Sequence, residues 1–205
     1  ANYRKKNNSV VLDTFEGQYA SRLICKNCGS ISNTFEPFVV LSLAIPVQKE
    51  KHDGDMITLE ECFSEFLKDE TLADSEKWYC ASCNELCPAG KKISILEEGL
   101  PPVLVIQLKR FTALGVKVNE PVKFPLDELN MKPFVLNSVQ SGTLKYRLYA
   151  VTDHSGVCGG GHYTAYSRCS DGKWRYFNDS QVSIMTHEPR DFGSGAYLLF
   201  YERVP

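Results

Sequence analysis

Apolar positions along the chain predict a protein built mainly of strands. Val103–Phe111 is apolar through Leu108 except at Gln107, as is typical of a central strand buried on both faces, with Lys109 and Arg110 expected at its solvent end. Shorter aromatic-rich or alternating segments predict antiparallel partners. They are Tyr19–Ile24, a long covered run from Ile31 to Leu43, Lys91–Glu97, Tyr146–Thr152, His162–Cys169, Lys173–Phe177 and Ala196–Arg203.

One segment departs from the strand pattern and predicts a helix. Thr58-Leu59-Glu60-Glu61 has the capping-box pattern, and apolar residues follow it at helical spacing. The helix is expected to run from Leu59 to about Lys68. Residues 1–14 are polar and basic without sustained periodicity, so a loop is expected there. Together these patterns predict the α+β class with a mostly antiparallel sheet.

Composition limits the kinds of partner. The chain has 205 residues, 43% of them hydrophobic, enough for one core plus a small appendage stabilised in another way. A formal net charge of -2 gives no overall attraction to nucleic acid or to an anionic membrane. No apolar run approaches the roughly 20 residues that a membrane span needs. We therefore expect a soluble protein with no nucleic-acid and no membrane partner.

Four of the eight cysteines form two CxxC pairs about fifty residues apart, Cys25 with Cys28 and Cys80 with Cys83. Two such pairs are the usual ligands of a tetrahedral zinc ion. Gly29 and Asn84 follow the two pairs, and both residue types tolerate the positive φ of a metal-binding turn. The spacing predicts structural zinc; redox or disulfide use is the alternative. The other four cysteines are expected to be buried or idle thiols: Cys62, Cys87, Cys158 and Cys169.

A glycine-rich stretch leads into the strongest catalytic candidate, His162. About sixteen residues later, Asn178 and Asp179 offer side-chain acceptors at the end of another predicted strand. A histidine that acts as general base needs one ring nitrogen facing the reacting group and the other held by an acceptor. The pattern therefore indicates half of a catalytic site. The competing interpretation is a histidine that only packs within the sheet.

These motifs resemble those of the ubiquitin-specific proteases, a family of deubiquitinating cysteine proteases. The resemblance rests on the Gly160–Tyr166 histidine box, Trp174, the run Phe177–Ser180 and the closing Tyr197–Tyr201. The two CxxC pairs, the helix that begins at Leu59 and the run Leu108–Phe111 match the family in the same order. The matches extend from about residue 15 to the end of the chain.

The resemblance implies a papain-like cysteine protease fold shaped like a hand. Its palm is built on the antiparallel sheet, and its fingers form a β-hairpin zinc ribbon. The implied organisation is a polar segment over residues 1–14, fingers with part of the palm over 15–100, and palm with the histidine box over 101–205. Implied partners are ubiquitin and ubiquitinated proteins, and the implied location is intracellular, in the cytoplasm, the nucleus or both.

By position in the motifs, His162 is similar to the family's general base and Asn178 to the residue that orients it. Asp179 matches a neighbouring acidic residue that assists. Residues 153–161 resemble a loop that covers the ubiquitin tail. The resemblance implies tail contacts from Gly160 and Gly161, and also from Tyr163 and Trp174, for which ordinary sheet packing is the alternative.

One part of the family pattern is missing from the chain. The family carries its nucleophilic cysteine on a thumb that precedes the fingers, and none of the eight cysteines here has that motif around it. The thumb is expected on a separate or excised segment of the same protein; a deliberately isolated palm and fingers, or a complete inactive chain, are the alternatives. We expect the chain alone to be inactive as a thiol-dependent deubiquitinase. The rival hypothesis is a catalytically silent zinc-ribbon module that binds ubiquitin or serves as a scaffold.

Overall fold

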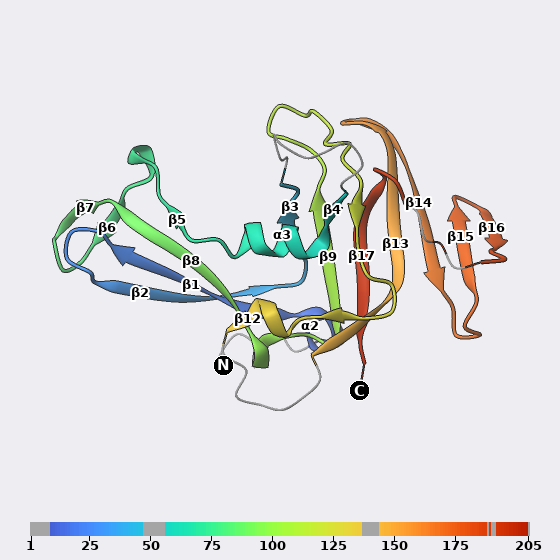
Figure 1. Cartoon of the computed structure of the whole chain (residues 1–205), viewed down its shortest axis with the longest axis horizontal. Coiled ribbons are helices and arrows are strands. Elements are labelled where there is room, and N and C mark those ends of the chain that lie inside the picture. The colour runs from blue at the N-terminus through green and yellow to red at the C-terminus, as the bar shows by residue number, and fades with distance from the viewer. Residues whose placement is uncertain (1–8, 47–55, 137–143, 188, 190–191, 205) are drawn as a thin grey trace.

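The computed structural model describes residues 9–46, 56–136, 144–187, 189 and 192–204. Two large sheets dominate it, and they lie at opposite ends of an elongated molecule (Figure 1). The α+β class and the mostly antiparallel pairing are confirmed. The first eight residues of the expected N-terminal loop lie outside the described residues, and the predicted domain boundaries remain a prediction.

The eight-stranded sheet, called the palm here, carries the histidine motif. Its strands run in the order β16-β15-β14-β13-β17-β9-β3, with β11 paired to β13. Only β3 and β9 pair in parallel; the other pairs are antiparallel. The strands are β3 (Leu41–Ala44), β9 (Val103–Lys109), β11 (Leu129–Asn130), β13 (Lys145–Val157), β14 (Gly160–Arg168), β15 (Trp174–Asn178), β16 (Gln181–Ile184) and β17 (Ala196–Arg203).

As predicted, β9 is an interior strand and its last residue, Lys109, is exposed, but the next residue, Arg110, does not reach the solvent. Arg110 is 0% exposed, because its side chain folds back to bond backbone carbonyls. Its Nε donates to the carbonyl of Ala196 at 3.0 Å, and its Nη1 donates to the carbonyls of Val118 and Glu120. The expectation of a solvent end at Arg110 was therefore wrong. Through these hydrogen bonds, the guanidinium of Arg110 connects the end of β9 to the following loop and to the start of β17.

The second sheet, called the fingers here, has the order β12-β8-β1-β2, with β5 paired to β8. A small hairpin, β6–β7, lies at its far end (Figure 1). A further two-stranded sheet pairs β4 with β10. These strands are β1 (Gly17–Cys25), β2 (Ile31–Phe38), β4 (Ile57–Thr58), β5 (Glu70–Thr71), β6 (Trp78–Cys80), β7 (Glu85–Cys87), β8 (Ala89–Leu96), β10 (Val122–Lys123) and β12 (Val135–Leu136).

The single covered strand expected from Ile31 to Leu43 was wrong. The first strand ends at Phe38 and a second begins at Leu41, so the run forms β2 in the fingers and β3 in the palm. Most of β2 is exposed or half-buried, and Phe35 is 59% exposed. The first part of the run thus belongs to the fingers sheet and the last part to the palm sheet. The outer side chains of β2 remain exposed.

Two α-helices and three short 3-10 helices complete the described chain; the 3-10 helices are η1 (Asp74–Glu76), η2 (Glu97–Gly99) and η3 (Lys132–Phe134). Helix α3 (Leu59–Phe66) begins at Thr58 with the predicted capping box, and it packs beside β3 and β4. The N-terminal loop prediction was partly wrong, because α2 (Val10–Phe15) forms with Ser9 as its cap. In the described ranges, neither this helix nor any other is long and apolar enough to cross a membrane.

The interior is divided unequally. A large cluster of buried side chains lies between the palm sheet and α3, and includes Phe63, Leu104, Ile106, Tyr146 and Leu199. The fingers tip contains a separate small cluster of Cys25, Cys80 and Cys87, with Trp78 and Cys83 against it. The fingers tip thus contains sulfur in place of a hydrocarbon core.

Candidate functional site

The histidine motif lies in a β-hairpin formed by β13 and β14. Ser155 pairs with His162 and His154 with Tyr163, and the turn joins Val157 to Gly160. Gly156 and Gly159 have φ values of 100° and 80°, a region that favours glycine. Most of the expected covering loop at residues 153–161 is therefore paired strand, which corrects its description as a loop.

His162 and Asn178 are brought together by neighbouring strands. His162 lies near the start of β14, and Asn178 is the last residue of β15. Nε2 of His162 lies 2.6 Å from Oδ1 of Asn178. Because an amide oxygen only accepts, this bond places the imidazole proton on Nε2. Nδ1 then carries the free lone pair, so it is the nitrogen able to take a proton from a nucleophile.

Asp179 occupies the turn between β15 and β16 rather than a strand. Asn178 pairs with Gln181 across a two-residue turn of Asp179 and Ser180. Asp179 is exposed and has a φ of 50°, a conformation that aspartate adopts more readily than most residues. The turn conformation therefore explains an aspartate at position 179 independently of any role in catalysis. Its assisting role in catalysis remains a prediction.

The four predicted tail-contact residues lie in different surroundings. Gly160, Gly161 and Tyr163 are exposed on β14, with Tyr163 50% exposed. Trp174 is only 5% exposed and packs in the large core. The structure therefore favours the packing interpretation for Trp174. Contacts to a ubiquitin tail from the other three remain predictions.

The sequence reasoning did not single out His154, which lies beside this site. It is 3% exposed, and its ring is 4.6 Å from that of Tyr163 and 5.3 Å from that of Phe111. Burial, with Lys117 nearby, lowers the pKa of His154 below its ordinary 6.5. The imidazole is therefore neutral near pH 7. The burial of His154 could not be predicted from the sequence, because its strand has no regular alternation of apolar and polar residues and a glycine follows two positions later.

The cysteine pairs converge as predicted. The sulfur atoms of Cys25, Cys28, Cys80 and Cys83 all lie within 4.8 Å of one another. The Cys28–Cys80 and Cys25–Cys83 separations are 3.6 and 3.9 Å. Ideal tetrahedral zinc with bonds near 2.3 Å separates its sulfur ligands by about 3.8 Å. The donor set and its spacing therefore fit a zinc ion.

The turns that carry these cysteines have the predicted backbone. Gly29 and Asn84 have φ values of 73° and 59°. Their amides donate to the carbonyls of Cys25 and Cys80 at 2.9 and 2.8 Å, which closes each turn. The two turns face each other from β1–β2 and from β6–β7. The predicted role of both residues in the turns is confirmed.

The remaining cysteines have other surroundings. Cys62 is 0% exposed on α3, and burial raises the pKa of its thiol to about 11, so it is a poor nucleophile. Cys87 is buried beside the four-cysteine cluster, and Cys169 follows the far end of β14 from His162. Cys158 is exposed at the hairpin turn and lies against Gly115.

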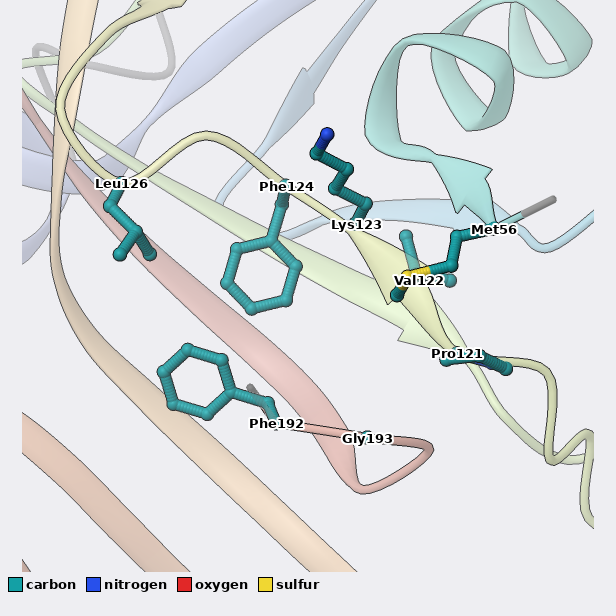
Figure 2. A pocket seen from close by; sticks show the side chains of 8 residues that line it. All are labelled: Met56, Pro121, Val122, Lys123, Phe124, Leu126, Phe192 and Gly193. Atoms are coloured by element: carbon teal, nitrogen blue, oxygen red, sulfur yellow. The ribbon is translucent and has the colours of Figure 1, made fainter. Parts of the chain in front are cut away.

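A separate apolar pocket of about 480 Å³ lies between β10 and the segment that precedes β17. Figure 2 shows Phe124 and Phe192 facing each other across it, and their rings stack at 5.2 Å. Lys123 supplies the one ionisable side chain among the eight lining residues. The pocket lining does not include His162 or Asn178, so it is distinct from the candidate catalytic site.

Comparison with known proteins agrees with this geometry. The family model "Ubiquitin carboxyl-terminal hydrolase" matches residues 1–201. The chain belongs to the ubiquitin carboxyl-terminal hydrolase family. It is 40% identical to ubiquitin carboxyl-terminal hydrolase 4 of Saccharomyces cerevisiae over 96% of the chain and 22% of that protein. It is also 40% identical to ubiquitin carboxyl-terminal hydrolase 2 of Gallus gallus, over 98% of the chain and 55% of that protein.

A solved structure of this hydrolase family is similar as well. It is the SAGA DUB module of Ubp8, Sgf11, Sus1 and Sgf73 bound to monoubiquitin, with a TM-score of 0.77 and 36% identity. The match covers 98% of this chain and 43% of that one. The chain thus spans between about a fifth and about half of the length of these relatives. The resemblance to ubiquitin-specific proteases is confirmed.

Proposed function

We propose that the protein containing this chain hydrolyses the isopeptide or peptide bond after the C-terminal glycine of ubiquitin. The observation that carries the proposal is the 2.6 Å bond between Nε2 of His162 and Oδ1 of Asn178. It fixes the tautomer in which Nδ1 is the base, as a Cys-His-Asn protease requires. The ubiquitin-bound relative supports ubiquitin as the substrate.

In the proposed reaction, Nδ1 of His162 takes the proton of a cysteine thiol, and the sulfur attacks the carbonyl carbon of the terminal glycine. His162 then gives the proton to the leaving amine, which departs as the thioester forms. Water, deprotonated by the same imidazole, releases ubiquitin and restores the thiol. Asn178 holds the ring throughout, and the assisting role of Asp179 belongs to the same proposal.

The nucleophilic cysteine is proposed to come from the thumb segment of the same protein. Support comes from the placement of the eight cysteines: four form the cluster, two are buried, and Cys158 and Cys169 lie at a turn and at a strand end. The cluster is proposed to hold structural zinc, which requires reduced thiolates and hence a reducing, intracellular compartment.

The test uses ubiquitin with a C-terminal electrophile, mixed with the full-length protein and with this chain alone. We expect a covalent adduct only when the thumb is present. His162→Ala should reduce turnover of a ubiquitin substrate by about a hundredfold or more, the usual contribution of a general base. Asn178→Ala should reduce it by a smaller factor, and Asn178→Asp should retain most of it, because an acceptor remains.

The matched control is Gln181→Ala, which removes the exposed cross-strand partner of Asn178 and should leave turnover unchanged. Absence of an adduct from the full-length protein would contradict the enzymatic proposal. If that protein still bound ubiquitin, the silent binding module would replace it.

A further inference from the structure

His154 is fixed in place from several directions. Its amide donates to the carbonyl of Gly195 at 2.8 Å, and its carbonyl accepts from Nζ of Lys117 at 2.6 Å. Its ring is in contact range of Phe111, Tyr163 and Tyr197. Since these residues come from β14, β17 and the segment after β9, the ring position is set by much of the palm.

The imidazole of His154 lies directly against the backbone of Gly161, the residue before His162. A Cβ placed on Gly161 would be 2.1 Å from Nε2 of His154 and 2.6 Å from the carbonyl oxygen of Ser155. On Gly160, the nearest atom to such a Cβ is 3.9 Å away. The backbone of Gly161 is outside the left-handed region, so this glycine is required for space rather than for conformation.

The choice of histidine is not explained by packing stability. Nδ1 of His154 is buried and has no hydrogen-bond partner within the described part of the chain. An unpartnered buried nitrogen costs free energy, so an apolar side chain would be favoured if stability alone decided. A phenyl ring, however, is one atom longer than imidazole and would press into Gly161, where there is no spare room. The short flat ring therefore suits this contact.

We propose that His154 is a positioning residue: its imidazole supports the backbone of Gly161 and so holds His162 at bonding distance from Asn178. The proposal rests on the proposed function of His162 as the base. Its structural basis does not depend on ubiquitin, because the position of His162 can be measured in the chain itself. A displacement of about 1 Å in a catalytic group is enough to reduce turnover about a hundredfold.

The first test follows the His162 tautomer by long-range ¹H–¹⁵N NMR correlation in this chain. In the unmodified chain the proton is expected on Nε2. In His154→Ala, which removes the support, we expect a mixture of the two tautomers. Val151→Ala is the matched control, because Val151 is equally buried on the same strand, and its truncation should lower stability without changing the tautomer. A folded His154→Ala with an unchanged tautomer would overturn the proposal.

The second test perturbs the same contact from the other side and covers the case in which His154→Ala does not fold. Gly161→Ala should displace the strand and mix the tautomers, whereas Gly160→Ala should not. In the full-length enzyme, His154→Ala should lower kcat about a hundredfold with KM changed less than about twofold. Gly161→Ala should lower kcat by a similar factor, and because Gly161 is also a predicted tail contact, its KM is expected to rise as well. An unchanged tautomer in Gly161→Ala would overturn the positioning role. A full-length protein without turnover would contradict the proposed function, and the tautomer would still decide the positioning role.

Discussion

At the scale of single residues, His154 predicts how stability depends on pH. Its pKa is lowered in the folded chain, so below about pH 6.5 the unfolded chain binds more protons and stability falls. The charged groups that face it are Lys117, which lowers its pKa, and Asp153, which raises it. Tyr163 and Tyr197 are the other titratable neighbours.

We therefore expect the melting temperature of the chain to fall between pH 7 and pH 5, and the fall to be smaller in His154→Gln. His187→Gln is the control, because His187 is exposed and its replacement should leave the slope unchanged. The carboxyl of Asp153 works in the opposite sense, since burial raises its pKa above 3.8, and it is present in both the parent chain and His154→Gln, so the comparison isolates His154. Equal slopes in the parent chain and His154→Gln would contradict the prediction.

The same residues show which parts of a site can be predicted from sequence. The contact between His162 and Asn178 could be predicted because each belongs to a motif and lies near the end of a strand. The burial of His154 could not, because the rings that bury it come from Phe111 and Tyr197, which are distant in the chain. Arg110 was misplaced for the same reason, since its bonding partners lie on other segments.

At the scale of elements, the cap of α3 is the clearest local determinant. Oγ1 of Thr58 accepts from the amide of Glu61 at 3.2 Å, and the Glu61 carboxylate accepts from the amide of Thr58 at 2.6 Å. Thr58→Ala should lower the free energy of unfolding by about 1 kcal/mol, as measured by urea denaturation. Ser64→Ala, which removes an exposed hydroxyl in the same helix, should have almost no effect. Equal losses in the two variants would show that the capping box contributes little.

Local patterns predicted this helix and the central strand because both are determined by nearby residues. The break between β2 and β3 was missed, since the apolar run gives no sign of which sheet each half joins. Pairing to different partners, β1 for one half and β9 for the other, decides it. Tertiary contacts of this kind have no counterpart in the periodicity of a single segment.

At the scale of the whole molecule, the palm and the fingers tip have separate buried clusters, and we expect only the fingers tip to depend on a bound metal for its stability. The palm buries a large apolar cluster, whereas the fingers tip buries chiefly cysteine sulfur. So small a cluster cannot offset the entropy of ordering two turns and a hairpin. A bound metal would supply that free energy directly, because the unfolded tip has no preformed site.

We therefore expect about one zinc per chain, and we expect a chelator to unfold the fingers tip before the palm. Hydrogen exchange should then speed up in β6, β7 and the turn at Cys25–Gly29, while β9, β13 and β17 keep their protection. Cys83→Ser should reproduce this pattern without chelator, and Cys169→Ser should retain zinc, because Cys169 lies outside the cluster. If metal removal left exchange in the tip unchanged, the sulfur cluster would be stable by itself. If it exposed tip and palm equally, the two interiors would unfold as one cooperative unit.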